Sequence, residues 1–542
     1  MLYVIGSGPA GVSCAHALLK KGHEVTMLDA GVVLEKEKRD VLVKLGKSKD
    51  WPEKLIHKIK CQLDIGAKDG PYKLSYGSDF PYKGLAEDIP LALDGALCRP
   101  SFAKGGLSTV WGAAVLPYID EDIAAWPISV ADLAPHYEEV LSFMPLVAGN
   151  DELVERFPLY TKNAQAPRQS KQASLLLSRL RKNKKKLYGE GFRFGSSRLA
   201  VQLDPKTGKE CVSCGLCLYG CPYELIYSSA QTLEELRKNK RFLYVPDVVV
   251  ERVEDLPDGA QIIAHGRLTK EKKNFSGEKV FVGCGAVPST KIMLASLEAY
   301  EVPITFKDSQ QFLIPCLTYR GVNNVTSEKL HTLCQMYVEI LDKKVDPRHV
   351  HLQIYTYNDV FEQWLKKKFK FLYPLFKFPF RLLMGRVVVI KAFLHSDSSG
   401  SIVMNLHKAN PPKVTLQGIP SAPRKRLRKI VAKIIKNTFA LGLLPILPIL
   451  KGSKPGGANH YGGSFPMAQN PQGFQSDVLG RPCGFKNVHL IDSSVFPSIA
   501  SQTITFTIMA NAHRIASQAV EEFKPVSVAA PLINPAASVK VS

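Results

Sequence analysis

The N-terminal segment constrains the fold more than any other part of the chain. An apolar strand, residues 2–5, runs into a turn with Gly6, Gly8 and Gly11, and an amphipathic helix and a second strand ending at Asp29 follow. The first glycine of such a βαβ unit permits the tight turn, the second lets the backbone approach a pyrophosphate, and the third lets helix and strand pack closely. Because a helix N-terminus also favours negative charge, the sequence predicts an α/β fold with a dinucleotide site.

The nucleotide at this turn could be NAD or FAD. Asp29 can accept a hydrogen bond from a ribose hydroxyl of either one, and Ser7 lies within the turn itself. A glycine-rich turn without a ligand is the alternative interpretation. The full order of strand, turn, helix, strand and acid favours the nucleotide site.

Three later segments bear on the choice of nucleotide. Residues 101–118 form a loop of small residues that could lie against a flat ring and a diphosphate. Residues 279–296 indicate a strand, a turn and the start of a helix. Residues 485–520 indicate a strand, a loop and a long helix. The chain has no second complete βαβ fingerprint for a nicotinamide nucleotide.

In this order, and with the motifs NHYGGSFPM (459–467) and HLIDSSVFP (489–497), the chain resembles the glucose-methanol-choline (GMC) family of FAD-dependent oxidoreductases. Its likeness is greatest to the branch containing sugar and sugar-acid dehydrogenases. The resemblance implies that FAD is the cofactor and that its ADP half meets the N-terminal turn and the backbone of Val250. The residues so implied in FAD binding are Gly6, Ser7, Gly8, Gly11, Asp29, Gly105, Gly106, Ser108, Trp111, Val250 and Asp492.

His460 is the candidate general base. A flavin that oxidises an alcohol takes hydride from carbon, and the hydroxyl proton must leave to a base beside the substrate oxygen. Histidine suits that task near neutral pH. Glycines on both sides of His460 allow a loop to present the ring, and the family's catalytic histidine falls on it. A structural hydrogen bond is the alternative role.

GMC members usually carry a second His or Asn six residues after the proline equivalent to Pro497. Counting here reaches Thr503, with Gln502 beside it. Threonine can donate and accept a hydrogen bond but is no base near pH 7, so His460 would work nearly alone. Both residues could instead only cap the following helix.

Residues 211–222, CVSCGLCLYGCP, carry four cysteines at the spacing of bacterial ferredoxins. These candidate metal ligands are Cys211, Cys214, Cys217 and Cys221. One copy of the motif predicts a 3Fe-4S cluster or a 4Fe-4S cluster, with structural zinc as the alternative. Some GMC dehydrogenases similarly carry such a cluster, which would relay electrons to an external acceptor.

Composition excludes several classes of protein. With 45% hydrophobic and 22% charged residues the chain is neither disordered, collagen-like nor a coiled coil. The formal net charge of +22 points to lipid headgroups, a phosphorylated substrate or an acidic redox partner, since no motif supports nucleic-acid binding. Eleven cysteines are too few for a disulfide scaffold and suit a reducing compartment.

The expected location is the cytoplasm, because the first strand begins without a leader and no apolar stretch is long enough to span a membrane. Residues 361–394 mix aromatic and basic side chains, so peripheral contact with the inner membrane face is one reading. A substrate-domain helix and strand with a solvated basic face is the other.

We expect a discontinuous Rossmann-like FAD-binding domain and a second, substrate domain of antiparallel sheet and helices. The FAD-binding pieces are residues 1–45, 90–120, 200–296 and 450–522, with the cysteine insert at 211–222. The substrate-domain pieces are residues 121–199 and 297–449, and residues 523–542 form a flexible tail.

The leading hypothesis is a dehydrogenase that oxidises a CH–OH group of a sugar or polyol and passes electrons through the iron-sulfur cluster to an external acceptor. A second is an oxidase that uses O2 and holds structural zinc at the cysteines. A third is a non-catalytic electron-transfer or membrane-docking flavoprotein, motivated by the missing second His or Asn.

Overall fold

The computed structural model describes residues 1–47, 52–60, 74–203, 210–375 and 377–521. The first of its two lobes contains a five-stranded, all-parallel sheet in the order β20-β9-β1-β2-β5. The strands are β1 (Leu2–Ile5), β2 (Val25–Leu28), β5 (Phe242–Val245), β9 (Lys279–Val282) and β20 (Val488–Leu490). Segments far apart in sequence therefore build one sheet.

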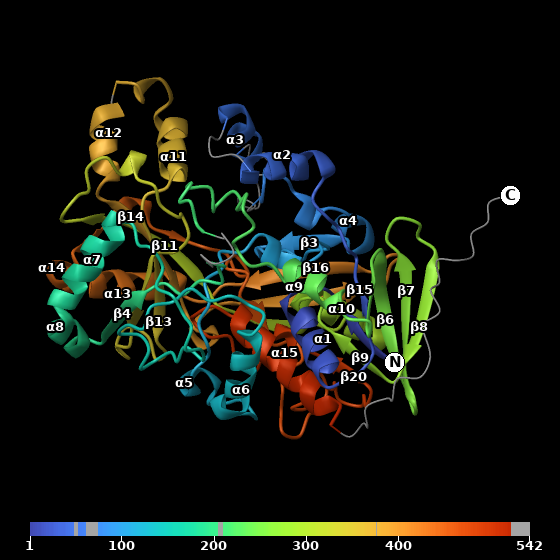
Figure 1. Cartoon of the computed structure of the whole chain (residues 1–542). Coiled ribbons are helices and arrows are strands. Elements are labelled where there is room, and N and C mark those ends of the chain that lie inside the picture. Colours follow the sequence, from blue (N-terminus) through green and yellow to red (C-terminus); the bar gives the residue numbers. More distant parts are fainter. Residues whose placement is uncertain (48–51, 61–73, 204–209, 376, 522–542) are drawn as a thin grey trace.

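Helices cover this sheet. α1 (Pro9–Lys20) follows the glycine turn, and the C-terminal helix α15 (Thr505–Ala519) packs along it (Figure 1). The contact between turn and helix leaves no room for a side chain at Gly11, where a Cβ would lie 1.8 Å from the carbonyl oxygen of Gly6. α9 (Ser229–Leu236) and α10 (Ala286–Ser296) follow elsewhere on the lobe, and β6 (Val248–Leu256), β7 (Gly259–Gly266) and β8 (Lys272–Gly277) form a separate antiparallel sheet beside it.

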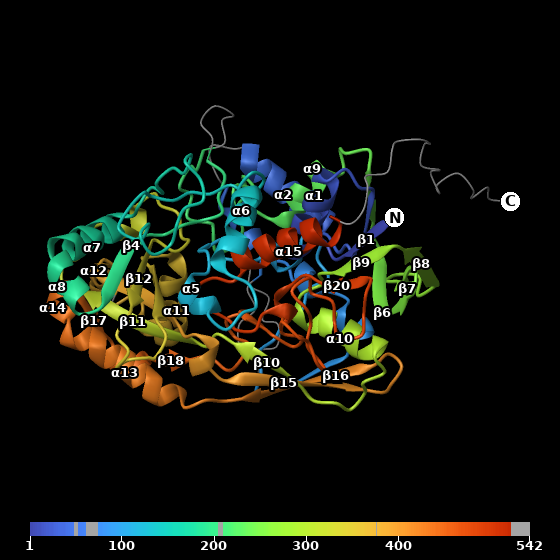
Figure 2. The same ribbon diagram turned by 90° about the horizontal axis from the view of Figure 1, so that it is seen from below.

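The second lobe contains a seven-stranded antiparallel sheet in the order β17-β11-β14-β13-β12-β4, with β18 also paired to β11. Its strands are β4 (Phe192–Ser196), β11 (Gln311–Thr318), β12 (Met336–Ile340), β13 (Val350–Tyr355), β14 (Val387–Phe393), β17 (Leu443–Pro445) and β18 (Lys451–Gly452). Figure 2 shows this sheet in the left half of the molecule and the parallel sheet in the right half.

The two faces of the seven-stranded sheet differ in chemistry because side chains alternate along a strand. On one face, Leu352, Ile354, Ile390 and Ala392 are buried in an apolar core with residues of the flanking helices. These helices are α7 (Lys171–Lys182), α8 (Lys184–Gly189), α13 (Pro423–Lys436) and α14 (Thr438–Leu441). The other face carries polar side chains and turns toward the first lobe.

A five-stranded sheet in the order β19-β10-β15-β16-β3 runs along the bottom of Figure 2 and reaches both lobes. Its strands are β3 (Leu91–Asp94), β10 (Ile304–Asp308), β15 (Ser401–His407), β16 (Lys413–Ile419) and β19 (Tyr461–Gly462). β3 pairs in parallel with β16, and the other pairs are antiparallel.

The remaining helices lie around this frame. They are α2 (Lys36–Lys47), α3 (Glu53–Lys60), α4 (Leu85–Asp88), α5 (Asp120–Ile123), α6 (Val130–Val140), α11 (Asp359–Phe369) and α12 (Lys377–Met384). α11 and α12 project from the body beside α3 (Figure 1). Among the described residues, no helix is long and apolar enough to cross a membrane.

The expected fold class is confirmed, since a Rossmann-like parallel sheet stands beside a lobe of antiparallel sheet and helices. The domain boundaries stay a prediction. β3 comes from the 90–120 piece, which is predicted to belong to the FAD-binding domain. It pairs with β16 in the sheet β19-β10-β15-β16-β3 and not with a strand of the Rossmann-like parallel sheet. The tail predicted at residues 523–542 lies outside the described residues.

We expect Gly11→Ala to lower the free energy of unfolding of the ligand-free protein by about 3 kcal/mol, because the new methyl group would collide with the Gly6 carbonyl oxygen. Gly8→Ala is the matched control: no atom lies within 4 Å of its methyl position, and its φ of −65° suits alanine. Urea unfolding followed by circular dichroism measures both. Equal midpoints for the two variants would contradict the close contact of turn and helix.

Candidate active site

A cavity of about 950 Å³ lies where the carboxyl ends of the parallel strands face the polar side of the seven-stranded sheet. Gly6, Asp29, Asp492 and His460 all line it, although their positions span most of the sequence. The crevice outside the carboxyl ends of parallel strands is where open α/β sheets bind ligands. The volume is at the upper end of the range of cofactor pockets, about 300–1,000 Å³.

The glycine turn is held by Ser7. The Ser7 hydroxyl donates to the Asp29 carboxylate at 2.7 Å and accepts from the backbone N–H of Gly105 at 2.9 Å. Tyr244 donates to the same carboxylate oxygen at 2.9 Å. Burial raises the pKa of Asp29 to about 6, against the lowering effect of these hydrogen bonds. The structure thus joins the N-terminal turn to the loop that contains Gly105 and Gly106.

Asp492 ties two neighbouring strand ends together. One carboxylate oxygen accepts from the backbone N–H of Gly285 at 2.8 Å and from the Ser289 hydroxyl at 2.6 Å, and the other accepts from the Ser494 N–H at 2.9 Å. Burial raises the pKa of Asp492. Its side chain therefore fixes the turn after β9 next to the end of β20, at the cavity edge.

Most of the other predicted cofactor residues line the cavity, but Gly11, which packs against the Gly6 carbonyl, and Gly105 do not. Gly106, Ser108 and Trp111 line it, and Trp111 donates through Nε1 to the carbonyl oxygen of Tyr227 at 2.7 Å. Val250, on β6, lines the cavity with its neighbours Val248 and Val249. Gly105 touches the same network through its N–H to Ser7.

His460 is presented by a loop, as predicted. The preceding Asn459 has a φ of +58°, and the His460 carbonyl oxygen accepts from the Ser309 N–H at 2.9 Å. The ring stacks on Phe393 with centroids 5.4 Å apart. Its Nδ1 is buried and has no hydrogen-bond partner among the described residues. Burial, with smaller contributions from His351 and Lys391, lowers the pKa of His460 to about 4, so the ring is neutral at pH 7.

Thr503 and Gln502, the two candidates for a residue that assists His460, differ in where their side chains lie. Thr503 lines the cavity, and its hydroxyl oxygen accepts from the Leu116 N–H at 2.8 Å. Gln502 is fully buried and points away from the cavity: its amide donates to the Asp122 carboxylate, and its oxygen lies 3.1 Å from Nε2 of His349. Of the two, only Thr503 is positioned to meet a ligand.

Sequence reasoning missed the polar residues that the seven-stranded sheet contributes to the cavity. These lining residues are Gln311, Gln353, Tyr355, Lys391 and Lys451. A signal was present: in HVHLQIYTY the polar residues alternate with apolar ones, and Lys391 lies between Ile390 and Ala392 in an otherwise apolar strand. Only the register of β14 against β13, which pairs Lys391 with Gln353, shows which of these side chains meet.

The four cysteines come close enough to influence one another. The pKa of Cys214 is raised to about 11 and that of Cys217 to about 12, mainly by burial and to a smaller extent by the charges of neighbouring cysteines, Cys211 and Cys221 among them. Burial also raises the pKa of Cys221. Backbone hydrogen bonds, from Leu216 to Cys214 and from Leu225 to Cys221 among others, favour the thiolates. Such buried, amide-supported sulfurs suit a metal centre, which would replace their protons.

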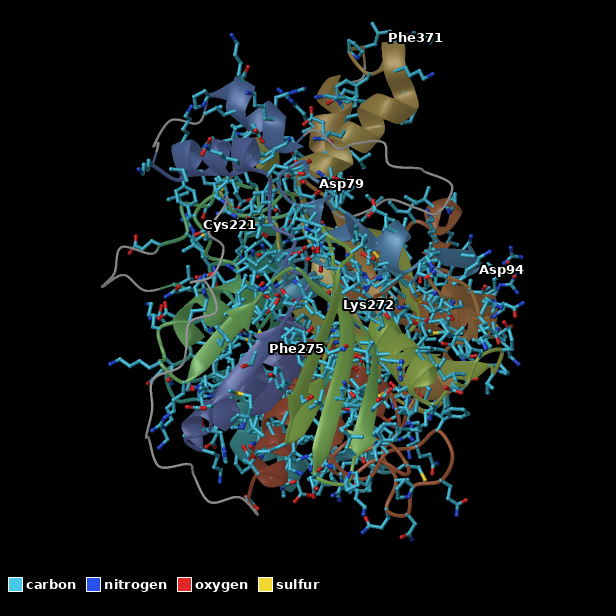
Figure 3. All side chains as sticks on the ribbon, turned by 90° about the vertical axis from the view of Figure 1, so that its right-hand side faces the viewer. Asp79, Asp94, Cys221, Lys272, Phe275 and Phe371 are labelled. Atoms are coloured by element: carbon cyan, nitrogen blue, oxygen red, sulfur yellow. The ribbon has the colours of Figure 1, made fainter. Side chains whose placement is uncertain are left out.

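The cysteine segment connects the cavity to the outside of the molecule. Leu218, between Cys217 and Cys221, lines the cavity, and Leu216 and Tyr219 pack against α2 and α3. Figure 3 shows Cys221 below these helices. Among the described residues, no three cysteine sulfurs lie within 4.8 Å of one another. Tetrahedral zinc would hold its sulfurs about 3.8 Å apart.

Comparisons with known proteins agree with this architecture. A family model described as an NAD(P)-binding Rossmann-like domain matches residues 4–34. Pyridoxine 4-oxidase from Mesorbium loti has a similar structure, with a TM-score of 0.58 and 13% identity over 95% of this chain and 98% of that one. A formate oxidase variant from Aspergillus oryzae RIB40, described for the effect of its mutation on FAD modification, is also similar. Its TM-score is 0.62 and its sequence identity 12%, over 96% of this chain and 98% of that one. The comparison with curated protein sequences gave no match.

We expect the ring of His460 to stay neutral from pH 8 to about pH 5.5, because its pKa lies near 4 rather than near the ordinary value of about 6.5. NMR of protein labelled with ¹³C at histidine Cε1 measures this, and the signal absent from His460→Ala assigns the ring. A midpoint near pH 6.5 would contradict the buried, positively flanked environment.

Proposed function

We propose that the chain is an FAD-dependent oxidoreductase of the GMC type that oxidises a CH–OH group of a sugar or polyol. The observation that carries this proposal is the meeting of the N-terminal glycine turn, Asp492 and the His460 loop around one cavity. Two proteins of similar fold are oxidases, and the description of one concerns its FAD. FAD bound in this cavity would supply the hydride acceptor.

The residues present fit the cofactor. No atom lies within 4 Å of a Cβ at Gly8, so the N-terminus of α1 is open to a diphosphate. Ser7, Gly105 and Asp29 form a cradle at the nucleotide end, and Val250 stands beside it on β6. Ser108 and Trp111 would lie nearer the ring, where Asp492 closes the edge.

His460 acts as the base in this proposal. The neutral ring has one nitrogen free to accept the substrate's hydroxyl proton, and the stacked Phe393 ring fixes its plane. Thr503 lines the same cavity and would orient the substrate hydroxyl through its own, with its place fixed by the Leu116 N–H. Gln502 would act only through the buried network behind the site.

We expect His460→Ala to retain FAD but to reduce the rate of anaerobic flavin bleaching by alcohol substrates by about two orders of magnitude or more, the scale of losing a general base. His407→Ala is the control, since His407 lies on β15, bonds to Glu301 and Thr415, and does not line the cavity. Stopped-flow absorbance measures the rate. Unchanged bleaching in His460→Ala would remove His460 from this role.

The proposal further assigns an iron-sulfur cluster to Cys211, Cys214, Cys217 and Cys221. Cys217 and Cys221 are buried, Cys211 and Cys214 are half-buried, and the backbone N–H groups that favour the thiolates support a metal centre. Because no three of the described cysteine sulfurs lie within 4.8 Å of one another, their separation favours a cluster over zinc. A cluster there would pass electrons singly from the cavity side, where Leu218 stands, toward an external acceptor. An oxidase that uses O2 is the second candidate function, favoured by the two oxidases of similar fold.

Cys217→Ser should lose most of its iron and acid-labile sulfide while keeping FAD and substrate bleaching, because Cys217 is a proposed ligand and does not line the cavity. Cys483→Ser, at an exposed cysteine, is the control. Metal and sulfide analysis of anaerobically purified protein measures the contents. One zinc per wild-type chain, with peroxide formed in step with substrate, would establish the oxidase instead.

We also propose that the enzyme works in the cytoplasm, in peripheral contact with the inner membrane face. Phe371, at the outer end of the projecting α11–α12 segment (Figure 3), is 82% exposed. Leu375, four residues on, is 76% exposed, and Lys366 and Lys370 are exposed lysines that precede Phe371 in the sequence. Apolar side chains among lysines suit an anionic lipid surface. Tyr219 of the cysteine segment donates to Asp359 of α11, so this contact would lie near the electron exit. Binding to vesicles with and without anionic lipid tests it.

A further inference from the structure

Lys391 is a cation in the middle of an apolar strand. Its neighbours Ile390 and Ala392 are fully buried in the core on one face of β14, so the lysine side chain turns to the other face and lines the cavity. The strand register places Lys391 beside Leu313 of β11 and Gln353 of β13, and Lys451 of β18 beside Leu313. Lys391 and Lys451 therefore lie in one row across the strands, and both line the cavity. Two strand spacings separate their Cα atoms, about 10 Å.

No acidic side chain among the described residues forms an ion pair with Lys391. Its ammonium lies over the Tyr355 ring, 4.9 Å from the ring centre. The carboxylates that line the cavity are Asp29, at the nucleotide end, and Asp492, beside the turn after β9, and each already accepts several hydrogen bonds. Burial lowers the pKa of Lys391, as expected for a cation without an anion.

Lys391 lies close to the candidate base. Its charge contributes to the low pKa of His460, and Phe393, two residues along β14, stacks on the His460 ring. Residues two apart on a strand are separated by about 7 Å. A small molecule with one group at His460 and another at Lys391 therefore needs only a few bonds between them. An anion on Lys391 would also cancel the charge that weakens His460 as a base.

The loop expected to meet the cofactor lies on the same side. A Cβ at Gly112, next to Trp111, would lie 3.9 Å from the Tyr355 hydroxyl. The sheet face that carries Tyr355 and Lys391 thus approaches this loop, and a substrate between them would meet both. This arrangement distinguishes Lys391 from the surface lysines that account for most of the chain's basic excess.

We propose that Lys391 binds the carboxylate of a hydroxy-acid substrate whose hydroxyl group meets His460. This inference rests on the function proposed above and narrows its substrate class from sugars and polyols in general to those that carry a carboxylate. A single ammonium flanked by Leu313 and Tyr355 matches a monoanion better than the two charges of a phosphate ester. Lys451 adds positive potential along the same wall and would attract the anion.

The test measures binding to the FAD-loaded protein, so it needs no knowledge of the natural substrate. Small carboxylates that bind beside the flavin perturb its absorbance, and we would titrate the monoanionic hydroxy acids glycolate, D-lactate and D-gluconate against their uncharged amides. Lys391→Met removes the charge at similar volume, and Lys391→Arg keeps it. Lys272→Met, at an exposed site on β8 (Figure 3) that does not line the cavity, is the control for loss of one positive charge.

We expect at least one carboxylate to bind the wild type and the Lys272→Met control tenfold or more tightly than its amide does. Lys391→Met should raise the Kd of that carboxylate ten- to a hundredfold, as for the loss of a charge-assisted hydrogen bond, with the amide unchanged. Lys391→Arg should restore most of the affinity. In Lys391→Met, the rate of flavin bleaching by D-gluconate should fall together with the carboxylate affinity, while the rate with the uncharged D-glucitol should not.

Three results would overturn the inference: no carboxylate binds better than its amide, Lys391→Met leaves the preference intact, or glycerol phosphate shows the larger dependence on Lys391. A shift of the flavin potential in Lys391→Met without a change in carboxylate binding would also overturn it, since the lysine would then act on the cofactor. Failure of the proposed function is distinguishable, because that protein would take up no FAD and show no bleaching dependent on His460.

Discussion

The hydroxyl of Ser7 is the point on which the nucleotide end of the structure depends. It donates to Asp29 and accepts from Gly105, so a single side chain joins the end of β2, the glycine turn and a loop about a hundred residues away. All three groups are buried, where an unpaired donor or acceptor would cost about 1–3 kcal/mol. The glycine turn, Asp29 and the Gly105 loop therefore keep one fixed arrangement. This arrangement forms the nucleotide end of the cavity.

The opposite wall is held by an equally close contact between two C-terminal motifs. The Gly463 N–H donates to the Ser493 carbonyl oxygen at 2.8 Å, and the Phe465 N–H donates to Ser494 at 2.9 Å. A Cβ at Gly462 would lie 2.1 Å from the Ser493 oxygen, so glycine is required there. The loop that presents His460 is thus fixed to the segment that carries Asp492. Base and cofactor edge are positioned by the same backbone contact, which explains why the two motifs serve one site.

Much of this could be predicted from sequence, because the relevant signals are local. The positions of Gly6, Gly11 and Asp29 follow from the βαβ pattern, and glycines around His460 indicated a loop. The choice between Thr503 and Gln502 could not be predicted, since adjacent residues differ only in which way the chain turns them. Lys391 was missed because its meaning depends on strand register: pairing with Gln353 and Leu313 shows its face, and the sequence alone contains no record of that pairing.

We propose that one cavity, formed between the N-terminal glycine turn and the His460 loop, holds FAD. Titration of the flavin-free protein with FAD, FMN and NAD, followed by flavin fluorescence and calorimetry, tests it most directly. We expect one FAD per chain and much weaker binding of FMN, which lacks the ADP half that the turn and Asp29 would hold. A colourless protein that takes up no FAD, or that binds NAD in its place, would contradict it.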